Sequence, residues 1–223
     1  MALMSVFARA NVSFEKGVGS VLYDKNGDDY IDFAAGIGVC SLGHANPVVT
    51  KAIKSQSKKL IHSSNLYEIP SQRALSEKID ELLGYKTYVF FCNSGAEANE
   101  CAIKLARKYG SKFESKKYEI ITLQNSFHGR TMASLQATGQ DKFHPDCFAP
   151  YMDGFNFYNG IDEVINHISD KTAAVMIELV QGEGGICPLD KEKVQNLAKI
   201  LKEKKILLIP MKSNAACIAR VSL

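Results

Sequence analysis

A serine, a glycine and an alanine come one residue after an apolar run in the stretch FFCNSGAEANECAIKLARKYG. The run predicts a strand, and the helical pattern after it predicts that Ser94, Gly95 and Ala96 begin a helix. Backbone N–H groups and the positive end of the helix dipole point outward there, which suits a phosphate group. The same residues fit a capping box between Ser94 and Glu97, which needs no ligand. The sequence leaves both interpretations open.

A phenylalanine, a histidine and an arginine lie close together in a second stretch, QNSFHGRTMASLQATGQ. An aromatic ring beside a guanidinium in a polar loop suits a flat anionic ligand, because the ring can stack on it and the guanidinium can bind its charge. Phe127, His128 and Arg130 are therefore candidate binding residues. The alternative is that Phe127 packs into the core and Arg130 forms a surface ion pair.

Two glutamates flank a glycine-containing turn in a third stretch, MIELVQGEGGICP. Glu178 and Glu183 could set the charge of a pocket, although solvated loop glutamates explain the same pattern. Each of the three loops lies at the carboxyl end of a different predicted strand, and the carboxyl ends of parallel strands meet at one edge of a sheet. The sequence therefore predicts that the three loops converge on a single site.

The elements that must position these loops change character along the chain. An Asn-Gly turn between two strand-like runs, residues 20–23 and 30–33, predicts a hairpin. Residues 47–60 and 71–83 carry apolar side chains at helical spacing and predict two amphipathic helices, the second closed by Gly84.

Strands and helices alternate after this point. Short, nearly continuous apolar runs predict buried strands at residues 88–92, 119–123, 174–179 and 206–209, and Pro210 is expected to stop the last one. Helical patterns occupy residues 96–109, 161–168 and 190–203. The alternation predicts an α/β fold with helical crossovers.

Composition indicates an ordinary soluble globular protein, with 46% hydrophobic and 23% charged residues among 223. The net charge of +3 comes from interleaved signs and gives no basic stripe for nucleic acid. The first residues do not form a signal-peptide pattern, and no apolar run approaches a membrane span. Six cysteines without CxxC or zinc spacing predict reduced, buried thiols, no metal site and a cytoplasmic protein.

The motifs NSGAEANE, NSFHGRT and ELVQGEGG, in this order and spacing, resemble the class III (ornithine-type) pyridoxal-phosphate aminotransferases. The segments GSVLYDKNGDDYIDFAAGIGVCSLGHANP and HSSNLYEIPSQ share the resemblance, which extends from about residue 8 to residue 209. It implies a partial PLP-transferase fold of type I. Residues 1–46 would contribute to the small domain and the subunit interface, and residues 47–209 would form an incomplete large cofactor-binding domain.

The resemblance implies a cofactor, pyridoxal 5′-phosphate, and a role for each candidate residue around it. Residues 94–96 would hold the phosphate. Phe127 would stack on the pyridine ring with His128 nearby, and Glu178 would lie close to the ring.

The resemblance also implies a reaction, the transfer of an amino group between an N-acylated ornithine and 2-oxoglutarate in arginine biosynthesis. It is strongest to the members that act on N-acetylornithine. Arg130 would pair with the substrate α-carboxylate, and Glu183 would alternately hold and release an arginine later in the family's sequence, so that one pocket accepts both substrates. Family members are dimers with sites at the subunit interface, so the resemblance implies a homodimer. The charge pattern and hydropathy of the sequence predict no nucleic-acid and no membrane partner.

Other functions stay open at this point. The substrate could be free ornithine, succinylornithine or succinyl-diaminopimelate, and the chain could bind pyridoxal phosphate weakly without turnover. A nucleotide-binding protein unrelated to aminotransferases would need a P-loop or a GxGxxG motif after the first strand, and the sequence has neither.

The residues after Ile209 depart from the family pattern. The family continues with A-D-E-V-Q-C-G-M-x-R-T-G, whose Asp keeps the pyridine nitrogen protonated, and Met211 stands at that place. The family's Schiff-base lysine comes later still and has no counterpart in this chain. Restoring one base before the Pro210 codon permits the translation I-A-D-E-V-Q-C-G-M. We therefore hypothesise that residues 210–223 are an out-of-frame tail and that the chain, with no intact catalytic residue, does not complete the reaction.

Overall fold

The computed structural model of the chain describes residues 3–211. Two compact units are present, Met1–Lys78 and Ile79–Leu223. The division falls within a helix, α2 (Pro70–Leu83). The domain boundaries expected after residues 46 and 209 stay predictions.

The first unit begins with a three-stranded antiparallel sheet of order β1-β2-β3. Its strands are β1 (Phe14–Val18), β2 (Val21–Asp24) and β3 (Asp29–Ile31). The predicted hairpin is confirmed as the pairing of β2 with β3, whereas β1 was not predicted. The Asp24 carboxylate accepts hydrogen bonds from the backbone N–H groups of Asn26 at 2.8 Å and Asp28 at 2.9 Å. Gly27 has a φ of +90°, which the turn requires.

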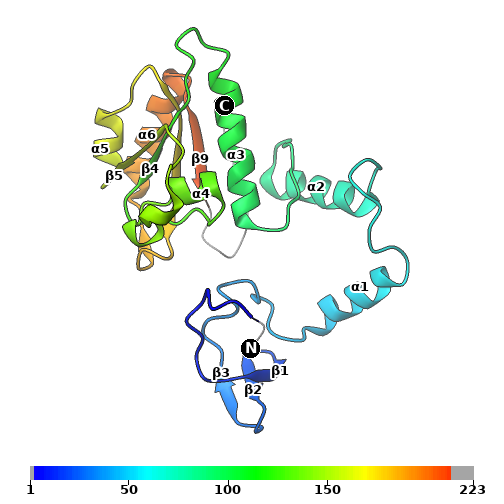
Figure 1. Ribbon diagram of the computed structural model, residues 1–223. Coiled ribbons are helices and arrows are strands. Elements are labelled where there is room, and N and C mark those ends of the chain that lie inside the picture. The colour runs from blue at the N-terminus through cyan, green and yellow to red at the C-terminus, as the bar shows by residue number, and fades with distance from the viewer. Residues whose placement is uncertain (1–2, 212–223) are drawn as a thin grey trace. The chain divides into compact units, whose positions relative to one another are not determined.

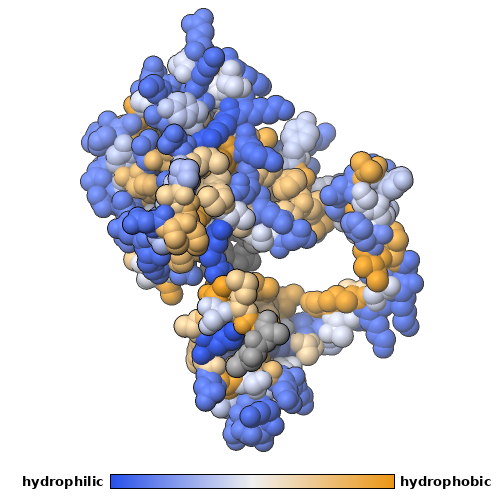
Figure 2. Space-filling model, viewed as in Figure 1, coloured by the Kyte–Doolittle hydropathy of each residue, from blue (hydrophilic) through white to orange (hydrophobic). Residues whose placement is uncertain are grey.

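Two helices follow this sheet, α1 (Pro47–Ser57) in the first unit and α2 across the division, and they confirm the predicted helical pattern. In α1, the Asn46 side chain caps the first turn by accepting from the Val48 N–H at 3.0 Å, and a proline takes the first helical position. No residue of α1 or α2 is buried, and apolar side chains lie at the surface of this unit (Figure 2).

The second unit is built on a parallel sheet of order β5-β4-β6-β9. The strands are β4 (Glu119–Leu123), β5 (Phe155–Tyr158), β6 (Thr172–Glu178) and β9 (Leu207–Met211). The helices are α3 (Gly95–Gly110), α4 (Met132–Ala137), α5 (Ile161–Asn166) and α6 (Lys191–Glu203). The smaller elements are the 3-10 turns η1 (Asp141–Phe143) and η2 (Asp146–Phe148) and a hairpin of β7 (Val180–Gln181) and β8 (Cys187–Pro188). The predicted α/β class is confirmed.

Helices cover both faces of this sheet (Figure 1). Successive side chains of a strand point to opposite faces, so Ile120 packs with α3 and α4 while Ile121 packs with α5 and α6. Met176 and Ile177 divide in the same way in β6. Burial on both faces is the reason that these strands are continuous apolar runs in the sequence.

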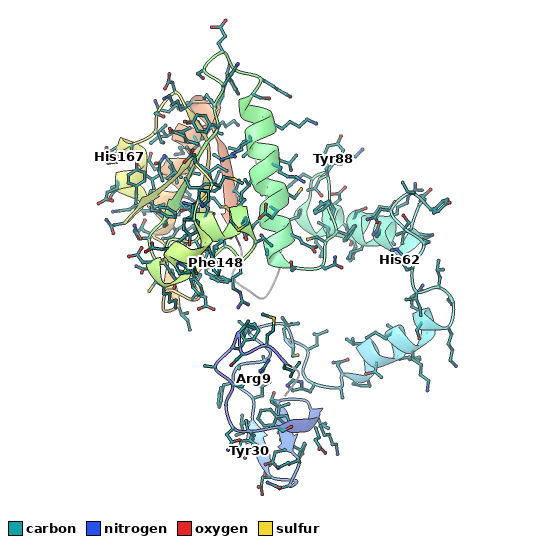
Figure 3. The ribbon with its side chains drawn as sticks, in the orientation of Figure 1. Arg9, Tyr30, His62, Tyr88, Phe148 and His167 are labelled. Carbon is teal, nitrogen blue, oxygen red and sulfur yellow. The ribbon has the colours of Figure 1, made fainter. Side chains whose placement is uncertain are left out.

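The strand predicted at residues 88–92 is wrong for the part of the chain that the structure describes, because these residues pair with no strand. They form the connection between α2 and α3, where Tyr88 is fully exposed (Figure 3). Phe90 in the same connection is 62% exposed. An apolar run becomes a strand only where a neighbouring strand receives its backbone hydrogen bonds, and the described sheet offers none here.

Two further expectations are corrected. Pro210 does not stop the last strand: β9 continues to Met211, whose carbonyl accepts a hydrogen bond from the Leu179 N–H at 3.1 Å. β9 is an outer strand of the described sheet, where a proline is tolerated because one side needs no donor. The described cysteines are free but not buried, and two of them are exposed, Cys147 in the short turn η2 and Cys187 in the two-residue strand β8.

Candidate functional site

The N-terminus of α3 is capped by its own side chains. The Ser94 hydroxyl accepts from the Glu97 N–H at 3.2 Å, which confirms the predicted cap. The Glu97 carboxylate reaches back to the N–H of Asn93 at 2.6 Å rather than to that of Ser94. The amides of Gly95 and Ala96 precede the first intrahelical bonds and have no acceptor among the described residues. Capping therefore leaves two donors that an anion could use, and the phosphate-binding interpretation of this stretch stays a prediction.

Phe127 lies in the connection between β4 and α4, just beyond the carboxyl end of β4. Its side chain is half-buried, and its ring packs at 5.4 Å from the ring of Phe143 in η1. Its backbone N–H donates to the Glu178 carboxylate at 2.9 Å. Phe127 is thus neither a core residue nor a free surface ring, and part of it remains available to a flat ligand.

His128 lies inside the second unit, at 2% exposure. Its backbone N–H donates to Thr138 Oγ1 at 2.9 Å, and its carbonyl accepts from Asn99 Nδ2 at 2.6 Å. Neither ring nitrogen has a hydrogen-bond partner among the described residues. Burial lowers the pKa of His128 to about 4, so the ring is neutral at physiological pH. A role for this ring beside a cofactor stays a prediction.

Arg130 is exposed and follows a glycine that packs tightly on α3. Gly129 has a φ of +133°, and a Cβ added to it would lie 2.9 Å from Ala96 Cβ and 2.4 Å from Ser134 Oγ. Only a glycine fits this approach without displacing its neighbours. The close approach joins the connection that carries Phe127 and Arg130 to the N-terminus of α3.

Glu178 is the last residue of β6 and is buried, at 6% exposure. Desolvation raises the pKa of its carboxyl, hydrogen bonds from the backbone of Phe127 and Gly182 oppose the rise, and the charge of Glu183 adds to it. Glu183 itself is exposed in the turn between β7 and β8. That turn is held to the second stretch by a hydrogen bond of 2.8 Å from Gln181 Nε2 to the Gln124 carbonyl.

The structure thus brings the three predicted stretches together at the carboxyl edge of the sheet. The stretch of α3 meets the second stretch at Gly129, and the third meets it at Phe127 and Gln124. Met211 joins them, because its position in β9 is opposite Glu178 of β6. Sequence reasoning missed Asn99, which holds the His128 carbonyl; the only available signal was its place one helical turn beyond Ala96.

The chemistry of this edge suits a phosphorylated aromatic anion. Two free amides at a helix start can bind a phosphate, a half-buried ring can cover a flat group, and an exposed guanidinium can bind a carboxylate. The described residues contain no group of three His, Cys, Asp or Glu side chains that could hold a metal ion.

These features define an α/β protein of the kind that binds a phosphorylated cofactor at the carboxyl edge of its sheet. A family model, "Aminotransferase class-III", matches residues 6–210, and the chain therefore belongs to the class III aminotransferases. This family depends on pyridoxal phosphate, so the predicted family, cofactor and partial PLP-transferase fold are confirmed.

The chain is similar to "Acetylornithine aminotransferase" of Wolinella succinogenes, with 53% identity over 91% of this chain and 52% of the relative. The N-acetylornithine aminotransferase of Stenotrophomonas maltophilia matches with a TM-score of 0.74 and 34% identity, over 91% of this chain and 50% of the other. The ornithine aminotransferase of Toxoplasma gondii matches with a TM-score of 0.85 and 27% identity, over 94% and 50%. The chain spans about half the length of the curated relatives that it matches.

Two expectations from the sequence concern other parts of the chain. No helix among residues 3–211 is long and apolar enough to cross a membrane. The hypothesised out-of-frame tail would begin at Pro210, and residues 212–223 lie outside the described residues, so the hypothesis stays a prediction.

Proposed function

We propose that the whole enzyme to which these residues correspond transfers an amino group between N-acetylornithine and 2-oxoglutarate, giving N-acetylglutamate semialdehyde and glutamate, as a step of arginine biosynthesis. The observation that carries this proposal is the 53% identity to an acetylornithine aminotransferase along the same residues that assemble the site. The protein is proposed to act in the cytoplasm and as a homodimer, as its family resemblance implies.

The cofactor is proposed to lie at the carboxyl edge of the parallel sheet. Pyridoxal phosphate, when bound, supplies the electron-withdrawing ring on which an amino group is carried between substrates. The amides of Gly95 and Ala96 and the Ser94 hydroxyl would hold its phosphate. Phe127 would cover the pyridine ring and exclude water, and Glu178 and His128 would lie close to the same ring. Burial raises the pKa of the Glu178 carboxyl above its ordinary value.

The substrates are proposed to bind through Arg130 and Glu183. The Arg130 guanidinium would take the α-carboxylate in paired hydrogen bonds. The exposed Glu183 carboxylate would hold an arginine of the complete family sequence when the substrate has no second carboxylate.

We further propose that the chain as written binds the cofactor and substrate carboxylates without completing the transfer. Met211 supports this proposal, because its thioether lies next to Glu178 in register and cannot keep a pyridine nitrogen protonated.

A titration of the purified chain tests the binding half of this proposal. Visible circular dichroism follows added pyridoxal phosphate, and calorimetry follows 2-oxoglutarate and N-acetylornithine, with the free and succinylated substrates as competitors. We expect Phe127→Leu to weaken pyridoxal phosphate binding about tenfold, since stacking of a flat heteroaromatic ring on an aromatic side chain is worth ~1–3 kcal/mol. Phe148→Leu is the matched control, because that ring is 53% exposed in η2.

Arg130→Ala is expected to abolish binding of 2-oxoglutarate and to leave pyridoxal phosphate binding intact. If the chain without substitutions binds neither pyridoxal phosphate nor 2-oxoglutarate, the proposed function is contradicted. Measurable amino transfer by this chain would contradict the proposed loss of turnover.

A further inference from the structure

Glu100 links α3 to the start of α4. Its half-buried carboxylate oxygen Oε1 accepts from the Thr131 hydroxyl at 2.5 Å. The same oxygen accepts from the backbone N–H groups of Ala133 and Ser134, each at 3.1 Å. One carboxylate oxygen on one helix thus holds three donors of another segment.

The three donors belong to the first turn of α4, which has no cap of its own. Thr131 is the N-cap residue, yet its hydroxyl bonds to no amide of its helix, and the first turn contains no acidic residue. The first amides of a helix need acceptors and favour negative charge. Glu100 supplies both from a different helix, 31 residues away from Thr131 in the chain.

Two neighbours of Glu100 on α3 hold the residues just before Arg130. Asn99 Nδ2 donates to the His128 carbonyl at 2.6 Å, and Ala96 lies against Gly129. Positions 96, 99 and 100 are spaced as neighbours on one face of a helix. The residues on both sides of position 130 are therefore fixed to the same helix face.

From this geometry we propose that Glu100 is a positioning residue, which sets the place of Arg130 relative to the phosphate-binding start of α3. The inference rests on the proposed function, in which Arg130 binds the substrate carboxylate. Asn99 fixes the connection before Arg130, and Glu100 fixes it after Arg130. A substrate carboxylate and a cofactor phosphate then bind at a set separation, because both binding groups are anchored to one helix. A small displacement of a group that orients two bound reactants lowers their binding or reaction strongly.

The test compares Glu100→Ala, Glu100→Gln and the matched control Glu114→Ala, whose side chain is exposed in the connection after α3. Calorimetry with 2-oxoglutarate and visible circular dichroism with pyridoxal phosphate give two affinities for each variant of the full chain. We expect Glu100→Ala to weaken 2-oxoglutarate binding at least tenfold and pyridoxal phosphate binding less than threefold. Glutamine keeps the accepting oxygen, so Glu100→Gln is expected to restore 2-oxoglutarate binding to within about threefold.

Hydrogen exchange provides a direct reading of the contact. The amides of Ala133 and Ser134 are expected to exchange at least tenfold faster in Glu100→Ala and to recover their protection in Glu100→Gln. Equal 2-oxoglutarate affinity in Glu100→Ala and the unchanged chain would overturn the inference. An equal loss of both affinities would also overturn it, because a merely structural role affects both ligands. If the unchanged chain binds no 2-oxoglutarate, the proposed function fails first and the inference fails with it.

Discussion

The two units of the chain use the same local rules and reach different degrees of burial. Helix α1 in the first unit and helix α6 in the second both begin with a side-chain cap, from Asn46 at 3.0 Å and from Asp190 at 2.8 Å. Yet α1 buries no residue, whereas α6 buries Leu197 and Leu201 against the sheet. Of the described residues, the first that is buried is Asn99.

The difference shows that caps and turns within the local sequence are enough to form helices and strands, whereas only tertiary packing buries them. Caps and turns satisfy backbone groups within a few residues, so they work equally in both units. Burial needs a second surface, and in the second unit the parallel sheet provides one on each face. Loss of stability on mutation should therefore depend on the unit far more than on the type of element.

The largest expected contrast comes from shortening an isoleucine in each unit. Ile177→Ala removes a side chain with 0% exposure between the sheet and α6. We expect it to lower the free energy of unfolding by ~2–5 kcal/mol, because it leaves a cavity. Ile53→Ala, at a position 64% exposed in α1, should change it by less than ~0.5 kcal/mol. Urea unfolding followed by circular dichroism measures both, and an equal loss would contradict the comparison.

Two glycines with positive φ give the next contrast. Gly129→Ala forces a Cβ to within 2.4 Å of Ser134 Oγ and is expected to cost about 3 kcal/mol from overpacking and backbone strain. Gly27→Ala has the same kind of backbone strain, but no atom lies within 4 Å of the new Cβ, so about 1 kcal/mol is expected. Thermal unfolding of both variants separates crowding from strain. An equal loss of stability in the two variants would mean that Gly129 is not packed tightly against α3.

The buried histidine predicts a pH dependence that belongs to the second unit. The pKa of His128 is about 4 in the folded protein and about 6.5 when unfolded, so the unfolded state binds the proton first as the pH falls. Stability is therefore present above pH 6.5 and is lost towards pH 4, with a loss of about 2 kcal/mol between pH 7 and pH 5. His128→Gln should remove this dependence of the free energy of unfolding on pH, which urea unfolding at several pH values between 7 and 5 measures. An unchanged slope would show that the ring is hydrated.

A carboxylate of the first unit provides the control for this slope. A hydrogen bond of 2.7 Å from His44 lowers the pKa of Asp32 below its usual value of 3.8. Its contribution is present above pH 3.8 and is lost only below that pH. Asp32→Asn should therefore leave the slope between pH 7 and pH 5 unchanged.

The smallest effects are expected where the units should not differ. An exposed ion pair occurs in each, Arg73 with Glu68 and Lys193 with Asp162. Exposed pairs gain little attraction and lose side-chain freedom. Glu68→Gln and Asp162→Asn should both leave the urea midpoint unchanged within error. A clear shift in one alone would show that surface charge, as well as burial, separates the units.

Sequence reasoning predicted the second unit best where strands are buried on both faces. The strand at residues 119–123 was found with its observed bounds, and the start of α3 within one residue. The strand β5 (Phe155–Tyr158) was missed, because its alternating FNFY pattern is short and lies at the outer edge of the sheet. The run at residues 88–92 looked equally apolar but has no neighbouring strand.

For the candidate site, too, the sequence predicted one part and missed another. Its residue types were visible in the sequence, since Ser94, Phe127 and Arg130 follow predicted strands and Glu178 lies at the carboxyl end of one. Their joining contacts were not visible, because they link residues 51 apart at Phe127 and Glu178 and 29 apart at Asn99 and His128.

The sequence by itself determined the family, the cofactor chemistry and most of the helices and strands, because these depend on residue types and on periodicity within a short window. Only the tertiary structure decided which apolar runs are buried, that His128 lies in the core, and that Glu100 holds the start of α4. These outcomes depend on backbone hydrogen bonds and packing between segments that are distant in the chain, and no local pattern records such partners.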